Sequence, residues 1–273
     1  MAGVAILYPF YEICRLAVSD VSRFGQVRGF VGLGNFRDIF ADPVFLAALV
    51  RTLVWTGSVV GGTLLAALPV AMVLNRPFLG RGVARVIVML PWAVSLSMAA
   101  IVWLWSFNGD YGMVNALLQQ AGLIDKPVQW MARASTAFPV QIMVGILVST
   151  PFTVTILLGG LSSIPGDVYE AAAIDGATGW QAFRAMTLPL LRGFIGLAVV
   201  LNVIYVFNSF PIIWVMTQGG PDNGTHILVT FLYERAFILG RPGQAAAVSL
   251  VMLAIVFLST LVYLRLQGRE QSA

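Results

Sequence analysis

The stretch Glu170–Gly176 (EAAAIDG) lies between two long apolar segments and is followed ten residues later by Met186–Pro189 (MTLP). It is a short, polar, helix-prone segment in a chain otherwise dominated by apolar residues. Asp167 is predicted to cap a helix through Ala173, and Gly176 to allow the sharp turn that follows. A second short helix is predicted over residues 180–186. The pattern therefore predicts a helix–turn–helix segment on a membrane surface, accessible to a soluble partner protein.

Composition places the chain in a lipid bilayer. Hydrophobic residues make up 59% of the 273 residues, charged residues only 10%, and the mean hydropathy is +0.87, which excludes a soluble domain of this length. A membrane-spanning helix needs about 20 mostly apolar residues. Five stretches satisfy this requirement: about 45–75, 84–107, 137–161, 188–216 and 243–266. We therefore predict an all-α polytopic membrane protein that forms one transmembrane domain over residues 1–273.

The first apolar segment, Met1–Val18, is predicted as a sixth, short span. It carries Glu12 and Arg15, each of which costs a few kcal/mol at the centre of a bilayer. The alternative is a signal peptide, but the segment lacks a basic start and a small-residue cleavage site. Only eight residues precede Pro9, and we expect the N-terminal part of this span to be missing from the chain.

Residue counts and motifs exclude several kinds of site. One cysteine, Cys14, and one histidine, His226, cannot build a Cys/His metal site or an internal disulfide. The net charge of +4 comes from loop arginines without interleaved aromatic residues, which argues against nucleic-acid binding. No Gly-x4-Gly-Lys-Ser/Thr phosphate loop is present, so ATP binding by that route is excluded. His226 is predicted as a loop residue without a catalytic role.

Charged residues around the spans bear on energy supply and orientation. Apart from Arg51, Arg85, Arg192 and Arg265 near span ends, the five spans are uncharged, whereas ion-coupled carriers usually keep buried carboxylates or histidines. The energy for any transport is therefore expected from outside this chain. Totals of Arg and Lys on the two sides tie, but Arg76, Arg81 and Arg85 crowd one tight turn. This density favours their side, which carries the polar segment, as cytoplasmic.

Four prolines lie inside or near the ends of the predicted spans: Pro91, Pro139, Pro151 and Pro211. Each removes a backbone donor and kinks its helix unless neighbours compensate. The alternative is that membrane helices tolerate these prolines without functional consequence. Four bent helices are more typical of a protein that encloses a cavity than of a straight bundle.

A polar stripe runs along the predicted span 188–216. Asn202, Tyr205, Val206 and Ser209 recur at i, i+3, i+4 and i+7 and share one helical face. One interpretation is helix-to-helix hydrogen bonding. The other is a path for a polar solute, because hydrocarbon cannot satisfy these groups. An aromatic face beside amide and hydroxyl groups suits sugars, which present both C–H faces and hydroxyls.

The polar segment resembles the cytoplasmic coupling loop of ABC importer permeases. The order is Glu-Ala-Ala, three residues, Gly, nine residues, an aliphatic residue, one residue and Leu-Pro, with Met186 at the aliphatic position. Further motifs are similar to those of the sugar-type importers, in particular the larger permease of the maltose importer. They are Val31–Phe36 (VGLGNF), Leu90–Trp92 (LPW), Asp110–Gly112 (DYG), Thr150–Phe152 (TPF), Asp175–Ala177 (DGA) and Thr217–Pro221 (TQGGP).

This resemblance implies a type I importer permease core and assigns roles to three sets of residues. A cytoplasmic coupling loop, residues 164–189, would contact an ATPase subunit through Glu170, Ala171, Ala172, Asp175 and Gly176. The substrate path would include Asn202, Tyr205, Ser209, Ser149 and Phe152. An external loop, residues 217–242, would face a binding protein through Gly219, Gly220 and Pro221. Val206 departs from the maltose permease pattern, which has an amide-bearing residue there.

The resemblance also implies a function and its partners. The chain would be the non-catalytic permease subunit of an ATP-driven importer in a bacterial or archaeal cytoplasmic membrane. Its cargo would be a di- or oligosaccharide or a glycerol-phosphate-type solute, moved by alternating access. A second permease, two ATPase subunits that bind ATP and Mg, and an external substrate-binding protein would complete the system. The alternatives are an ATP-independent carrier or channel and, with less support from the residues, a membrane-embedded enzyme.

Overall fold

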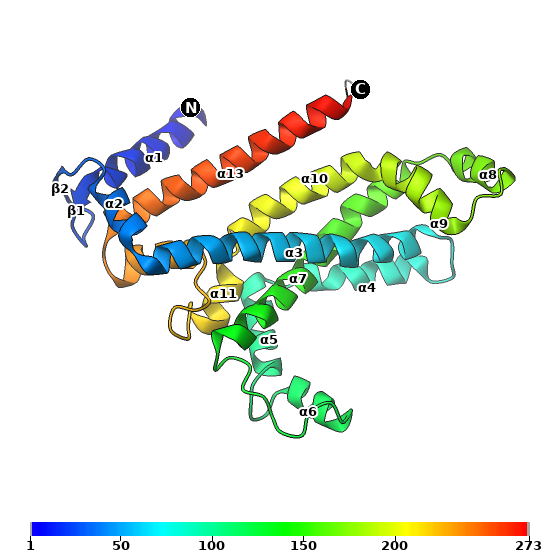
Figure 1. Ribbon diagram of the computed structural model, residues 1–273, viewed down its shortest axis with the longest axis horizontal. Coiled ribbons are helices and arrows are strands. Elements are labelled where there is room, and N and C mark those ends of the chain that lie inside the picture. The colour runs from blue at the N-terminus through cyan, green and yellow to red at the C-terminus, as the bar shows by residue number, and fades with distance from the viewer. Residues whose placement is uncertain (1, 272–273) are drawn as a thin grey trace.

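The computed structural model describes residues 2–271, and helices form most of it (Figure 1). The α-helices are α1 Ala2–Ala17, α2 Gly34–Ala41, α3 Pro43–Asn75, α4 Arg81–Ala93, α5 Leu96–Ser106, α6 Met113–Gln120, α7 Ala134–Ser162, α8 Gly166–Ile174, α9 Gly179–Ala182, α10 Leu188–Phe207, α11 Phe210–Thr217, α12 Leu228–Tyr233 and α13 Pro242–Gln271. Two π-helical turns occur, η1 Phe183–Thr187 and η2 Glu234–Ile238. The prediction of an all-α chain is correct except for one antiparallel hairpin, β1 Ser19–Val21 with β2 Val27–Phe30.

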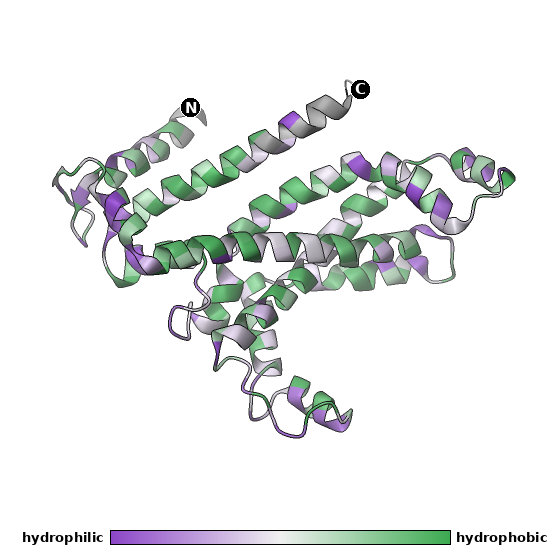
Figure 2. Ribbon diagram, in the orientation of Figure 1, coloured by the Kyte–Doolittle hydropathy of each residue, from purple (hydrophilic) through white to green (hydrophobic). Residues whose placement is uncertain are grey.

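Long apolar helices confirm the membrane-spanning character of the chain. Within residues 2–271, four helical stretches are long and apolar enough to cross a bilayer, and a bent pair would make a fifth. The four are Pro43–Asn75, Ala134–Ser162, Gly179–Thr217 and Pro242–Leu261. Apolar residues dominate these helices, whereas polar residues gather at the hairpin, around α6 and around α8 and α9 (Figure 2). Pro139 and Pro151 both lie inside α7, which continues through them.

The predicted span 84–107 is not one straight helix. It consists of α4 and α5, which meet at an angle of 93° (Figure 1). Pro91 lies in the last turn of α4, where it removes a backbone donor and crowds the preceding turn. Ser95 then starts α5, since its hydroxyl accepts a hydrogen bond from the Met98 amide at 3.3 Å. The prediction of a bend at Pro91 is correct, but its size was not foreseen.

The predicted span 188–216 is also interrupted, at Asn208 and Ser209 between α10 and α11. Pro211 occupies the first turn of α11, a position where its missing amide costs nothing. The Asn208 side-chain amide donates to the Ile204 carbonyl at 3.0 Å, and the Trp55 indole N–H donates to the Val206 carbonyl at 2.9 Å. The first bond satisfies a carbonyl of the last turn of α10, and the second adds a side-chain donor to the Val206 carbonyl, which also accepts from the Ser209 amide.

The first segment is helical but shorter than a standard span. α1 has 16 residues, which at 1.5 Å each gives about 24 Å against a hydrocarbon core of about 30 Å. It lies beside α13, which also contacts α10 (Figure 1). The expected count of six spans therefore exceeds the number that length and composition support within residues 2–271.

Helix α7 lies at the centre of the fold and packs against α3 and α10. Gly145 allows the Trp55 ring and the Val59 side chain to lie against its backbone, since an added Cβ would come within 2.9 Å of both. Gly160 does the same for Leu191, with a corresponding distance of 2.7 Å. Small residues at such crossings let membrane helices approach closely. The Gly145 contacts hold α3 against α7, and the Gly160 contact holds α10 against α7. The cavity described below lies between α7 and α10.

Candidate functional site

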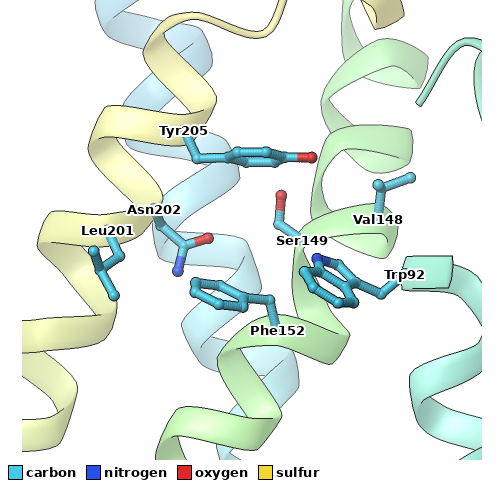
Figure 3. Close-up of a pocket in the computed structure, with 7 residues that line it drawn as sticks. All are labelled: Trp92, Val148, Ser149, Phe152, Leu201, Asn202 and Tyr205. Carbon is cyan, nitrogen blue, oxygen red and sulfur yellow. The ribbon is translucent and has the colours of Figure 1, made fainter. Parts of the chain in front are cut away.

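A cavity of about 270 Å³ lies between α7, α10 and the end of α4 (Figure 3). Its lining residues are Trp92, Val148, Ser149, Phe152, Leu201, Asn202 and Tyr205. Four of the five residues predicted to form a substrate path therefore meet at one place. None of the lining residues is charged, so the cavity suits a solute recognised by aromatic faces and a few hydrogen bonds.

Asn202 combines the two interpretations of the polar stripe. Its side chain is only 1% exposed, and its amide nitrogen donates to the Thr153 hydroxyl at 2.9 Å and to the Ala198 carbonyl at 2.8 Å. The nitrogen therefore ties α10 to α7, as the helix-bonding interpretation predicted. The amide oxygen points toward the cavity (Figure 3), where it is available as an acceptor for a solute hydroxyl.

Aromatic rings form two sides of the cavity. The Phe152 and Trp92 rings stack with their centroids 6.1 Å apart and their planes 14° apart. The Tyr205 ring lies on the opposite side, and the Ser149 hydroxyl points toward it from α7 (Figure 3). A flat solute with apolar faces and polar edges would contact rings on both sides and hydrogen-bond to Ser149 and Asn202.

Two residues of the predicted stripe do not line the cavity. Val206 is 1% exposed and belongs to the apolar core. Ser209 is buried and lies beyond the last residue of α10. The periodicity of 3.6 residues holds only while the helix continues, and α10 ends at Phe207. The helical period therefore does not extend to Ser209, whose part in the substrate path stays a prediction.

Sequence reasoning missed Trp92, Val148 and Leu201 as lining residues. Trp92 comes from α4, whose bend near Val94 brings it beside Phe152. Its position could not be inferred without the angle between α4 and α5. Val148 and Leu201 each precede a predicted path residue in the chain, but an apolar residue in a span carries no signal that separates lining from core or lipid-facing positions.

The polar segment forms α8, α9 and the turn between them. Glu170 and Asp175 are exposed, as is Ala171, whereas Ala172 is buried against this chain. Helix α8 ends at Ile174, and the turn predicted at Gly176 follows, where φ is +74°. The Ala177 amide donates to the Ala172 carbonyl and the Gly176 amide to the Ala173 carbonyl, the bonding pattern of a glycine-dependent helix C-terminus.

The start of α8 and the second short helix differ from the prediction. The residue that precedes α8 is Pro165, not Asp167, which lies in the first turn without a side-chain capping bond. Proline here fixes the extended entry of the chain, and Asp167 still complements the helix dipole. Thr178 and Gln181 form a capping box that begins α9. From α9 the helix continues through η1 into α10, so residues 180–186 are not a separate helix.

The loop after α11 is tightly folded around a histidine. Gly219 has φ +85°, and a Cβ there would overlap the His226 ring. Gly220 and Pro221 are partly exposed, whereas Gly219 is buried. The Arg51 side chain donates to the Asn223 carbonyl at 2.8 Å, which holds the tip of the loop against α3. Of the three residues predicted to face a binding protein, only Gly220 and Pro221 reach the surface.

His226 is a buried structural residue. Its ring is 2% exposed, and Nδ1 lies 3.1 Å from the Thr230 hydroxyl. Burial, with the nearby charges of Arg51 and Arg235, lowers the pKa of His226 to about 4. Although Nε2 lies 3.6 Å from the Glu234 carboxylate, the ring is neutral at pH 7 and the two groups form no ion pair.

Lowering the pH from 6.5 to 4 is expected to lower the free energy of unfolding by roughly 3 kcal/mol through His226. In this window the unfolded chain takes up a proton that the folded chain cannot accept, because the folded pKa lies below the unfolded one. The unfolding midpoint of purified protein, measured against pH, checks this. In His226→Gln the unfolding midpoint should depend less steeply on pH between 6.5 and 4. An equal pH dependence in the variant and the wild type would contradict the lowered pKa of His226.

Comparison with known proteins places the chain in a family. The family described as binding-protein-dependent transport system inner membrane component matches residues 46–271. A probable ABC transporter permease protein of Brucella suis biovar 1 (strain 1330) is 58% identical over 273 residues, which cover 100% of this chain and 94% of the relative. The trehalose/maltose transport system permease protein MalF of Thermococcus litoralis is 35% identical over 262 residues, covering 96% and 88%.

The fold has a solved counterpart. A bacterial ABC transporter involved in the import of the acidic polysaccharide alginate contains a chain with a TM-score of 0.82, at 24% identity, covering 96% of this chain and 91% of that one. At this identity the similarity concerns the fold alone. The extent of the family match and the identity of the two relatives decide the assignment. The chain belongs to the family of inner membrane components of binding-protein-dependent transport systems.

Proposed function

We propose that this chain is the permease subunit of an ATP-driven importer and that it moves a carbohydrate through the cavity between α7 and α10. The observation that carries the substrate class is the cavity itself, whose uncharged walls combine rings on two sides with the Ser149 hydroxyl and the Asn202 amide oxygen. The relative from Thermococcus litoralis is named for trehalose and maltose, which supports the same class.

The cavity is small for a complete binding site. Its volume of about 270 Å³ lies just below the usual range of about 300–1,000 Å³, and Trp92 and Tyr205 are about half exposed. We infer that a second, homologous permease supplies the remaining wall. An external binding protein would deliver the solute, as the family description implies for its members.

Energy would enter through α8. The exposed Glu170 and Asp175 make α8 a candidate contact for a soluble ATPase subunit, with α8 on the cytoplasmic side and the loop 217–242 outside. ATP and Mg would be bound by the ATPase subunits. Closure of two such subunits would move α8 and rotate the attached spans, which opens the cavity alternately to either side. Six spans, with α1 as the first, would complete the core.

Tyr205→Ala is expected to lower the uptake of a transported sugar by about tenfold, since stacking on one ring contributes about 1–1.5 kcal/mol. The measurement is uptake of radiolabelled sugars and glycerol phosphates into proteoliposomes that contain the assembled transporter. Tyr205→Phe keeps the ring and should retain at least a third of wild-type uptake. This pair is preferable to Asn202→Ala, which would also break the bond to Thr153. Equal uptake by Tyr205→Ala and the wild type would contradict the proposed path.

A further inference from the structure

We propose that Tyr169 is a positioning residue that transmits the displacement of α8 to the cavity-lining helix α10. The Tyr169 and Thr187 hydroxyls share a hydrogen bond of 3.1 Å, and the Thr187 side chain is 4% exposed. Within residues 2–271, this is the only side-chain hydrogen bond that joins α8 to another helical segment. The inference rests on the coupling role proposed above for α8.

The residues that flank α8, Pro165 and Gly176, carry no side-chain group that could hydrogen-bond to a span. Pro165 precedes the helix in an extended conformation, and Gly176 follows it with φ +74°. Pro165 fixes the entry and Gly176 the exit of the chain, but neither residue ties the nine-residue helix to a span. Ala172 is buried, but one methyl group restrains rotation weakly. The hydroxyl bond of Tyr169 is therefore the directional link between α8 and the spans.

Thr187 lies in a segment whose geometry follows from the sequence. Pro189 has no backbone N–H for the Ala185 carbonyl four residues earlier, and its ring crowds that carbonyl. The helix widens here into the π-helical turn η1, in which the Leu188 amide donates to the Phe183 carbonyl five residues back. Such turns are often found at functional sites. The wider turn is also where the Thr187 hydroxyl meets Tyr169.

Helix α10 then carries a displacement from Thr187 to the cavity. Asn202 lies 15 residues and Tyr205 18 residues beyond Thr187, which corresponds to about 22–27 Å along the helix. The residues from Leu188 to Phe207 form one uninterrupted helix. Leu191 is fully buried against α7 beside Gly160. This contact lies one turn beyond Thr187 and gives α10 a point about which to rotate. A force applied through Tyr169 therefore turns the helix that holds both solute-contacting side chains.

The test is the number of sugar molecules transported per ATP hydrolysed, measured on the complete transporter in proteoliposomes. Tyr169→Phe and Thr187→Val each remove one hydroxyl and keep the shape of the side chain. We expect each to lower this ratio at least fivefold while the ATPase subunits still co-purify. The double variant should be no worse than either single one, because both remove the same interaction. Thr187→Ser keeps the hydroxyl and should keep the wild-type ratio. A purely steric role of the Thr187 side chain would instead predict a loss in this variant.

The outcomes separate this inference from the proposed function. If Tyr169→Phe leaves the ratio unchanged while Glu170→Arg releases the ATPase subunits, α8 is the coupling helix and the role of Tyr169 is overturned. If ATPase subunits fail to co-purify even with the wild-type chain, the proposed function itself is wrong. Should Thr187→Val not fold, Tyr169→Phe decides alone, since its ring can keep the same half-buried position.

Discussion

Glu170→Arg is expected to release the ATPase subunits from the complex and to lower ATP-driven uptake more than tenfold. Glu170 is exposed on α8, and reversal of a charge at a protein contact costs about 2 kcal/mol or more, roughly 30-fold in affinity. Co-purification of the ATPase subunits, followed by uptake assays, measures both effects. Glu170→Gln should cause a smaller loss, because it removes an attraction without adding a repulsion.

Asp125→Arg is the matched control for this prediction. Asp125 is an exposed carboxylate in the segment between α6 and α7, on the opposite side of the membrane in the proposed orientation. The charge reversal is the same as in Glu170→Arg, but it lies away from α8. Asp125→Arg should therefore leave ATPase binding intact. Retention of the ATPase subunits by Glu170→Arg, at wild-type yield, would show that α8 is not the contact and that the resemblance to a coupling loop is misleading.

Gly219→Ala is expected to destabilise the protein by about 2–5 kcal/mol, the sum of left-handed backbone strain and steric overlap. Gly219 has φ +85°, and a methyl group there would displace the His226 ring. His226 holds Thr230 at the start of α12, so the disturbance would spread into the loop. We expect a lower unfolding temperature and reduced yield of folded protein.

Gly122→Ala separates the two causes. Gly122 has φ +68° with open space around the added carbon. The Gly122→Ala variant should therefore show only the backbone strain of about 1–2 kcal/mol, without steric overlap. The unfolding temperature of Gly219→Ala should therefore fall clearly below that of Gly122→Ala. If the two variants unfolded at the same temperature, the His226 contact would contribute nothing, and Gly219 would be needed only for its backbone conformation.

Residue patterns were sufficient for features that depend on local physics. Composition identified the bilayer environment, and apolar runs located α3, α7 and α13, because a run of apolar residues has few alternatives to a spanning helix. The turn at Gly176 followed from the conformation that glycine alone adopts readily. The helical period placed Asn202 and Tyr205 on one face, and the cavity between α7 and α10 contains both.

Predictions failed where a helix was assumed to continue. Ser209 was placed on the cavity face by a period that stops at Phe207. A bend at Pro91 was predicted for the span 84–107, but not the angle of 93° between α4 and α5. The sequence shows the prolines but not whether neighbouring side chains compensate for the lost bonds. Asp167 was likewise predicted as the cap of α8, whereas the residue before the helix is Pro165; both residue types are common at helix starts.

The membrane environment, the main spans, the α8 turn and the family resemblance follow from the chain itself, because each depends on residues close together in sequence. The cavity wall formed by Trp92, the bond between Tyr169 and Thr187 and the burial of His226 under Gly219 depend on the tertiary structure. Each joins segments whose relative position is set by helix bends and by close contacts at small residues. Such distances arise from the sum of many weak contacts, and no local pattern encodes them.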